Sequence, residues 1–216
     1  MGESGSGKTT AMRTLNPKET FYIDCDGKGL SWKGWKQQYI RINESKENAE
    51  SFNYFRSNNQ DSIVALMNRI SEKKPEIKNI VIDTANSIMV ADEFRRMKEK
   101  GYDKWQDLAM SVYQITTKAS ALRDDLNVIV LFHIQVEKDE TSGRQFTRIL
   151  TNGKLLNKVG LEKYFTTVLL SKQDDNGEYV FETKSNNSTV KTPMGAFDRD
   201  QIPNDMQVVL DALAEY

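Results

Sequence analysis

Short apolar runs alternate with amphipathic segments along this chain. Phe21–Asp24, Ile80–Ile82 and Val128–Phe132 are apolar runs bounded by polar or turn-forming residues, as in buried strands. Over Ser62–Lys73, apolar residues recur at the spacing of one helix face. Strands that are buried on both faces are typical of parallel sheets covered by helices. The pattern predicts an α/β fold with a mostly parallel central sheet flanked by helices.

The same reasoning predicts several further elements. Gln38–Ile42 is a weaker strand candidate. Pro75 ends the predicted helix Ser62–Lys73. Helices are expected over Thr9–Leu15, Ser62–Lys73, Ile88–Lys98 and Trp105–Leu122, and from Pro203 to Leu213.

The character of the sequence changes after Gln135. Residues 136–160 are polar, basic and interrupted by glycine, which predicts a long loop of the kind that carries function. Beyond it, Thr166–Leu170 and Tyr179–Thr183 flank the turn sequence Asp174–Gly177. This arrangement predicts an antiparallel hairpin near the C-terminus.

Composition narrows the class of protein. A chain of 216 residues with 38% hydrophobic and 28% charged residues is expected to form a single domain over residues 1–216. The formal net charge of −1 gives no overall attraction to nucleic acid, so any such binding needs a local patch. The only cysteine, Cys25, excludes an intrachain disulfide and suits a reducing cytoplasm. No apolar run reaches the length of a membrane-spanning helix, so no membrane partner is expected.

The most informative motif lies at the start of the chain, where Gly2–Thr9 fits the phosphate-loop pattern G-x-x-x-x-G-K-[ST]. Glycines let successive backbone N–H groups surround a phosphate at a helix N-terminus. Lys8 is expected to reach the β- and γ-phosphates, and the Thr9 hydroxyl to ligate Mg²⁺. The alternative is a flexible Gly/Ser surface loop. The predicted cofactors are ATP and Mg²⁺, and the predicted ATP-binding residues are Gly2, Glu3, Ser4, Gly5, Ser6, Gly7, Lys8, Thr9 and Thr10.

The placement of this loop is unusual, because only Met1 precedes Gly2. In phosphate-loop folds a buried strand leads into the loop, and its neighbours pair with it. We therefore expect that the usual first strand is missing. Either the natural chain extends upstream, or another strand takes the central place in the sheet.

Carboxylates follow two of the predicted strands. Asp83 ends the run Asn79–Asp83 and is expected to face Mg²⁺ through a water, since open α/β sheets bind ligands at the carboxyl ends of their strands. The alternative is a cap on the next helix. Asp24 and Asp26 stand at the end of the strand that begins at Phe21, on opposite sides of the pleat. Asp26 lies further past the strand and is the candidate base that orients the attacking water; Asp24 is the next candidate, and a solvated turn is the alternative.

Polar residues also follow the predicted strand Val128–Phe132. His133, the only histidine, and Gln135 are placed to sense the γ-phosphate, although a lone histidine is more often a packed core or surface residue. Residues 136–158 combine cations with one aromatic residue. This combination suits phosphate contacts and base stacking on single-stranded DNA. Acidic residues dilute this patch, and a plain solvated loop is the alternative. The candidate DNA-binding residues are Lys138, Arg144, Phe146, Arg148, Lys154 and Lys158.

With these residues placed, the order of motifs resembles the RecA-like ATPase core in its short phage form, particularly Sak-type single-strand annealing recombinases and related phage nucleotide-binding proteins. YIDCD stands where that core has the strand ending in its catalytic glutamate, which aligns with Asp26. VIVLFHIQV resembles the strand that ends in the polar sensor and leads into a DNA-binding loop. The resemblance implies that Lys184 is the lysine that acts across a subunit interface. It also implies a homo-oligomer, a single-strand binding protein as partner, and the host cytoplasm as location.

The sequence therefore predicts a RecA-like phosphate-loop protein that binds ATP, hydrolyses it to ADP and phosphate, and binds single-stranded DNA in phage recombination or replication. Lys8, Asp26 and Lys184 are the expected catalytic residues. An aspartate in place of glutamate shortens the base by one methylene group. Two other functions stay open: a nucleotide-gated adaptor without hydrolysis, and a nucleoside or nucleotide kinase, although no lid segment with clustered arginines is evident.

Overall fold

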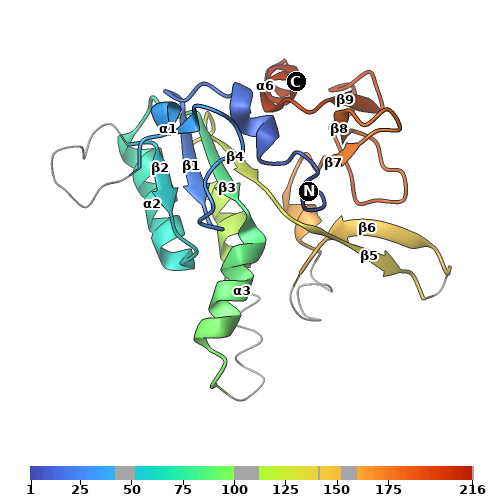
Figure 1. The fold of residues 1–216 in the computed structure, drawn as a ribbon, viewed down its shortest axis with the longest axis horizontal. Helices are drawn as coiled ribbons and strands as arrows, with labels where there is room; N and C mark the ends of the chain where they lie inside the picture. The colour runs from blue at the N-terminus through green and yellow to red at the C-terminus, as the bar shows by residue number, and fades with distance from the viewer. Residues whose placement is uncertain (42–51, 100–111, 141, 152–159, 216) are drawn as a thin grey trace. The chain divides into compact units, whose positions relative to one another are not determined.

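The computed structural model describes residues 1–41, 52–99, 112–140, 142–151 and 160–215 (Figure 1). The chain divides into two compact units. The phosphate-loop unit comprises Met1–Thr14, Phe132–Leu150 and Gly160–Tyr216, and the sheet unit comprises Leu15–Leu131 and Thr151–Val159.

The sheet unit is built on four parallel strands in the order β2-β1-β3-β4. All five residues of β1 and all five of β3 are buried, as the apolar runs predict. These two strands pair along their whole length, from Thr20 opposite Asn79 to Asp24 opposite Asp83. On its other side β3 pairs directly with β4. The strands are β1 (Thr20–Asp24), β2 (Tyr54–Arg56), β3 (Asn79–Asp83) and β4 (Asn127–Val130).

Helices lie alongside this sheet (Figure 1). The second, α2, begins after Asn59, whose side chain accepts a hydrogen bond from the Ser62 N–H at 2.9 Å. Its core-facing residues Ile63, Met67 and Ile70 are fully buried, which confirms the predicted helix face. The helical elements are α1 (Trp35–Gln38), α2 (Gln60–Lys73), α3 (Ala85–Arg95), residues 112–118 and the short η3 (Ala119–Ala121).

The phosphate-loop unit contains two antiparallel sheets. One is the ribbon of β5 and β6, and the other has the order β7-β8-β9. The β7–β8 pair confirms the predicted C-terminal hairpin and its turn, but the first strand runs over Leu170–Gln173 and not over the predicted Thr166–Leu170. The elements are η1 (Thr10–Thr14), β5 (Ile134–Lys138), β6 (Gln145–Ile149), η4 (Leu161–Tyr164), β7 (Leu170–Gln173), β8 (Tyr179–Glu182), β9 (Gln201–Pro203) and α6 (Met206–Ala214).

The long loop predicted for residues 136–160 is wrong in its first part, because that part forms the β5–β6 ribbon. Ile134 pairs with Ile149 and Val136 with Thr147, so β-branched residues face one another across the two strands. The polar residues between them had suggested a loop, but an antiparallel ribbon tolerates polar side chains on its solvent face. Residues 152–159 lie outside the described part of the chain.

Three other element predictions need correction. The predicted strand Gln38–Ile42 is wrong at its start, because Gln38 ends α1. Within that range Arg41 makes an isolated parallel bridge to Tyr54, and Ile42 lies outside the described residues. The predicted helix after the phosphate loop is the short 3₁₀ helix η1. The last helix begins at Met206 rather than Pro203, because Pro203 ends β9 and Asp205 caps the helix. Of the predicted helix Trp105–Leu122, only the part from residue 112 onwards is described.

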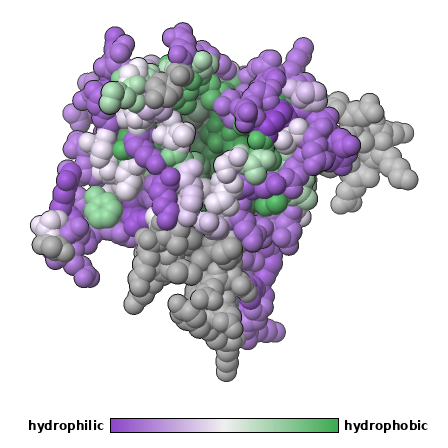
Figure 2. Space-filling view, turned by 180° about the vertical axis from the view of Figure 1, so that it is seen from behind, coloured by the Kyte–Doolittle hydropathy of each residue, from purple (hydrophilic) through white to green (hydrophobic). Residues whose placement is uncertain are grey.

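No helix among the described residues is long and apolar enough to cross a membrane. Hydrophilic residues cover most of the coloured surface seen in Figure 2, and hydrophobic ones form a smaller area.

A buried ion cluster holds strand β6 in the phosphate-loop unit. Glu162 Oε1 accepts hydrogen bonds from the Ile149 N–H at 3.0 Å and the Thr189 hydroxyl at 3.2 Å. Its Oε2 lies 3.4 Å from Arg148 Nη2, and Arg148 Nη1 lies 3.1 Å from Glu137 Oε2. A buried charge pair of this kind stabilises little by itself, but removing one partner leaves the other desolvated.

Replacing Glu162 with alanine should therefore destabilise the fold by about 3 kcal/mol, because Arg148 loses one of its two carboxylates and the Ile149 N–H loses its acceptor. Urea unfolding measures the change. The exposed Glu178→Ala is the matched control and should stay within about 0.5 kcal/mol of the wild type. A Glu162→Ala effect as small as that of the control would show that the cluster does not anchor β6.

Candidate functional site

Met1 and Gly2, at the start of the phosphate loop, are hydrogen-bonded on both sides. Gly2 N donates to Phe132 O at 3.0 Å, and Ser171 N donates to Met1 O at 2.8 Å. Gly2 also forms a parallel bridge with Ser171, at the start of β7. Met1 and the first loop residue, Gly2, thus make strand-like contacts at the entry to the loop.

The loop itself adopts a conformation that glycine allows. Gly5 and Gly7 have φ angles of 80° and 90°, in the left-handed region. Their backbone N–H groups form no hydrogen bond with any described residue. A Cβ at Gly7 would lie 2.9 Å from both Asn204 Oδ1 and the Tyr179 ring, so the loop packs closely against both side chains. The result is a tightly packed turn with free N–H groups, as an anion-binding nest requires.

Lys8 is buried beside this turn. Its ammonium group donates to Gly2 O at 2.8 Å and to Glu3 O at 2.5 Å, so the side chain folds back over the loop. Only 7% of Lys8 is exposed. Thr9 and Thr10 follow at the start of η1. The predicted ATP-binding residues Gly2–Thr10 therefore lie together in one short turn.

Two polar residues that sequence reasoning missed hold this turn in place. Ser171 Oγ donates to Ser6 O at 2.6 Å, and Asn204 Nδ2 donates to Ser171 Oγ at 2.9 Å. Arg13 adds a hydrogen bond from its guanidinium to Asn204 O at 3.2 Å. Ser171 and Asn204 are both buried. No motif marks them in the sequence, because their role depends on strands far along the chain.

In the sheet unit, the strand-end carboxylates are buried and hydrogen-bonded. Asp83 Oδ2 accepts a hydrogen bond from the Tyr22 hydroxyl at 2.6 Å. Burial, and then the Asp83 carboxylate, raise the pKa of Tyr22, so this hydroxyl stays protonated. Asp24 accepts from the N–H groups of Gly27 and Gly29 at 2.8 and 2.9 Å and from the Tyr54 hydroxyl. These contacts make Asp24 an anchor for the turn after β1.

Asp26 lies in that turn with three side-chain donors around it. Its Oδ1 accepts from the Thr84 hydroxyl at 2.8 Å and from the Ser87 hydroxyl, and its Oδ2 pairs with Lys28. Partial burial acts to raise the pKa of Asp26, but the hydrogen bonds from Lys28, Ser87 and Thr84 outweigh it and lower the pKa to about 2. Such a carboxylate stays ionised at neutral pH and accepts hydrogen bonds well, but it is a weak proton acceptor.

The predicted sensor residues lie where β4 gives way to β5. Leu150 N donates to His133 O at 2.8 Å, and Gln135 Nε2 donates to Glu137 Oε1 at 2.7 Å. Lys184, the lysine predicted to act on a neighbouring subunit, is exposed. Its Nζ lies 2.6 Å from Oδ1 of the exposed Asp200.

The predicted DNA-binding residues differ in exposure. Lys138 and Arg144 are exposed on the β5–β6 ribbon, and Arg144 Nε donates to Asn187 Oδ1 at 2.7 Å. Phe146 is half-buried on β6. Arg148 is buried in the ion cluster described above, where its guanidinium already has two carboxylate partners. Lys154 and Lys158 lie outside the described residues.

A sequence model of the AAA domain family matches residues 1–191, which include the phosphate loop and the carboxylates Asp24, Asp26 and Asp83. The chain belongs to the AAA domain family. Members of this family are phosphate-loop ATPases, which use ATP and Mg²⁺. Together with the parallel sheet, the match confirms the α/β RecA-like phosphate-loop fold. No curated protein shows significant similarity to the chain.

The residues present fit a nucleotide and its metal ion. The free N–H groups at Gly5 and Gly7 and the buried ammonium of Lys8 suit a phosphate chain. Among the described residues, no group of three or more His, Cys, Asp or Glu side chains could hold a metal ion. Mg²⁺ in ATPases is held by one or two protein oxygens together with the substrate phosphates, so it does not need such a group.

The two loop glycines differ in a way that stability measurements should detect. Gly5→Ala should cost roughly 1–2 kcal/mol from its φ angle alone, because nothing lies within 4 Å of a Cβ there. Gly7→Ala should cost more, by roughly 1–3 kcal/mol, since its Cβ also meets Asn204 and Tyr179. Denaturant unfolding of both variants measures the difference. Equal destabilisation of the two variants would contradict the close packing of Gly7.

The lowered pKa of Asp26 predicts how stability depends on pH. Because the folded pKa of about 2 lies below the ordinary value of 3.8, the ionised carboxylate stabilises the fold above about pH 4, and this contribution is lost as the pH falls towards 2. Asp26→Asn should cost about 2 kcal/mol at neutral pH and much less near pH 2. Urea unfolding across this range tests it, with the exposed Asp124→Asn as control. A cost for Asp26→Asn that does not change with pH would be evidence against the lowered pKa.

Proposed function

We propose that this protein hydrolyses ATP to ADP and phosphate and couples this activity to single-stranded DNA. The observation that carries the proposal is the phosphate loop: two left-handed glycines with free N–H groups, and a lysine folded over the turn they form. Backbone N–H groups and the lysine bind the triphosphate, with Lys8 on the β- and γ-phosphates. The Thr9 hydroxyl would ligate Mg²⁺ and Asp83 would face the ion through a water; the ion would stabilise the charge that develops on the phosphates.

Asp26 is proposed to orient the attacking water by accepting a hydrogen bond from it. Its low pKa weighs against complete proton abstraction in the ground state. Phosphoryl transfer passes through a loose transition state, in which positioning contributes more than base strength. The partners Thr84 and Ser87 fix the carboxylate for such a positioning role.

The DNA part of the proposal is supported by Lys138 and Arg144, which are exposed on the β5–β6 ribbon, with Phe146 close by in the sequence and half-buried. His133 and Gln135 lead into this ribbon and are proposed to sense the γ-phosphate. By resemblance, the physiological setting is phage recombination or replication, with a homo-oligomer in which Lys184 acts on a neighbouring subunit and a single-strand binding protein as partner.

A nucleotide-gated adaptor is the second candidate. The observation that favours it is the engagement of Asp26 by Lys28, Thr84 and Ser87, which leaves less of the carboxylate for a water. The two functions differ in turnover: the adaptor binds ATP but releases no phosphate. A nucleotide kinase would instead transfer the phosphate to a nucleotide.

Lys8→Ala should lower ATP affinity roughly 10- to 100-fold, because a buried charge-assisted contact contributes about 1.5–3 kcal/mol. Calorimetric titration measures the affinity, and phosphate release measured with and without single-stranded DNA measures turnover. The exposed Lys18→Ala is the control and should behave as the wild type.

DNA-stimulated phosphate release by the wild type would support the first proposal. ATP binding without release would leave the adaptor, and ATP affinity unchanged in Lys8→Ala would contradict the phosphate-loop assignment altogether.

A further inference from the structure

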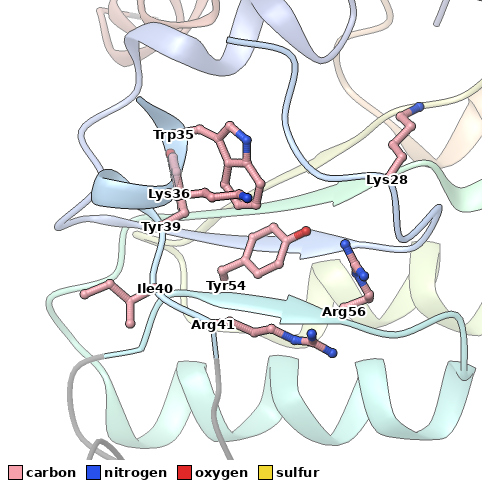
Figure 3. A pocket seen from close by; sticks show the side chains of 8 residues that line it. All are labelled: Lys28, Trp35, Lys36, Tyr39, Ile40, Arg41, Tyr54 and Arg56. Carbon is pink, nitrogen blue, oxygen red and sulfur yellow. The ribbon is translucent and has the colours of Figure 1, made fainter. Parts of the chain in front are cut away.

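The sheet unit contains a pocket of about 660 Å³ beside β2 (Figure 3). Its volume is within the range of about 300–1,000 Å³ that small-molecule sites occupy. No motif in the sequence marks this pocket, and it contains none of the proposed ATP-binding or catalytic residues. Four cations and three aromatic rings dominate its lining, which consists of Lys28, Trp35, Lys36, Tyr39, Ile40, Arg41, Tyr54 and Arg56.

The four cations are not equally neutralised. Lys28 pairs with Asp26, and Arg56 Nε lies 3.7 Å from Asp24 Oδ2. Within the described part of the chain, Lys36 and Arg41 form no ion pair. Both side chains are exposed. As far as the described residues are concerned, the pocket therefore presents positive charge that is available to an anionic ligand.

The aromatic side of the pocket is held in a fixed arrangement. The Trp35 ring packs on Tyr54 with their centroids 5.3 Å apart and their planes tilted by 41°. It also covers Gly29, where a Cβ would lie 2.8 Å from the Trp35 ring. The Lys36 ammonium lies 5.8 Å from the centre of the same ring. Trp35 is only half-buried, so part of its surface is available for stacking.

We propose that this pocket binds a nucleotide unit of single-stranded DNA. Lys36 and Arg41 contact its phosphates, and Trp35 provides the surface on which a base stacks. Proteins that bind single strands combine cations along the backbone with exposed aromatic rings in this way. The inference rests on the proposed DNA binding, but it places a contact in the sheet unit, apart from the β5–β6 ribbon.

The first experiment measures the affinity of the full chain for a fluorescein-labelled oligothymidylate by anisotropy across a range of salt concentrations. The double variant Lys36→Gln/Arg41→Gln should bind more weakly. The slope of log affinity against log salt should flatten by roughly 0.7 for each phosphate that the variant no longer neutralises. The matched control is Arg69→Gln/Lys73→Gln, which removes the same charge from the exposed side of α2. The control should keep the wild-type slope, and both variants should keep the phosphate release seen without DNA.

The second experiment tests the stacking surface directly. Trp35→Leu should weaken binding roughly 5- to 150-fold, the range found when base stacking is removed. Because Trp35 also packs on Tyr54, the wild type is in addition cross-linked by light to an oligonucleotide carrying 5-iodouracil. Mass spectrometry of the tryptic peptides should place the cross-link on Trp35.

The outcomes separate the two proposals. If the wild type binds the oligonucleotide but the pocket variants bind it equally well and the cross-link forms elsewhere, the inference is wrong while DNA binding stands. If the wild type binds no oligonucleotide, both are wrong. If thymidine monophosphate binds as tightly as the oligonucleotide, the pocket is a site for free nucleotides and the assignment to a strand is overturned.

Discussion

A phosphate loop has to keep its backbone N–H groups free of partners inside a folded chain, and the phosphate-loop unit is arranged around this constraint. The N–H groups of Gly5 and Gly7 form no hydrogen bond with a described residue, so within the described part of the chain they do not stabilise the turn. Other groups do so: Ser171 binds Ser6 O, and Asn204 binds Ser171. A turn held by its carbonyl groups and by packing leaves its donors to a ligand, but it requires glycine wherever φ is positive.

The carboxylates of the sheet unit obey a related constraint, because buried charges need donors. Asp24 obtains them from the N–H groups of Gly27 and Gly29 and from Tyr54. This fixes the turn in which Asp26 lies, so the structural and the proposed catalytic carboxylate are coupled through one short segment. The same turn contains Gly29, over which Trp35 packs. One buried aspartate thus positions both the candidate water-orienting group and the aromatic side of the pocket.

Sequence reasoning found those elements whose signals are local. The runs at β1, β3 and β4 and the face of α2 follow from periodicity, and the β7–β8 turn follows from Asp174–Gly177. It missed β2, since Tyr54–Arg56 is only three residues long and has one buried residue. It mistook β5 and β6 for a loop, because cross-strand pairing such as Val136 with Thr147 is not visible in a single sequence. The candidate site shows the same division: Lys8 stands in a recognisable motif, whereas Ser171 becomes evident only when distant strands are placed side by side.

Electrostatics explains why the distribution of charge matters more here than its total. A chain with a formal net charge of −1 does not attract a polyanion over long distances, and at physiological salt the Debye length of about 8 Å confines each charge to its surroundings. Binding must therefore depend on places where cations gather without equal numbers of carboxylates. The pocket meets this condition, since Lys36 and Arg41 stand beside two cations whose own partners are Asp26 and Asp24. A ligand phosphate at Lys36 and Arg41 would add to these ion pairs without having to break them. Arg148 has the residue type expected of a DNA contact, yet it is buried between Glu137 and Glu162, so its charge is already matched by carboxylates.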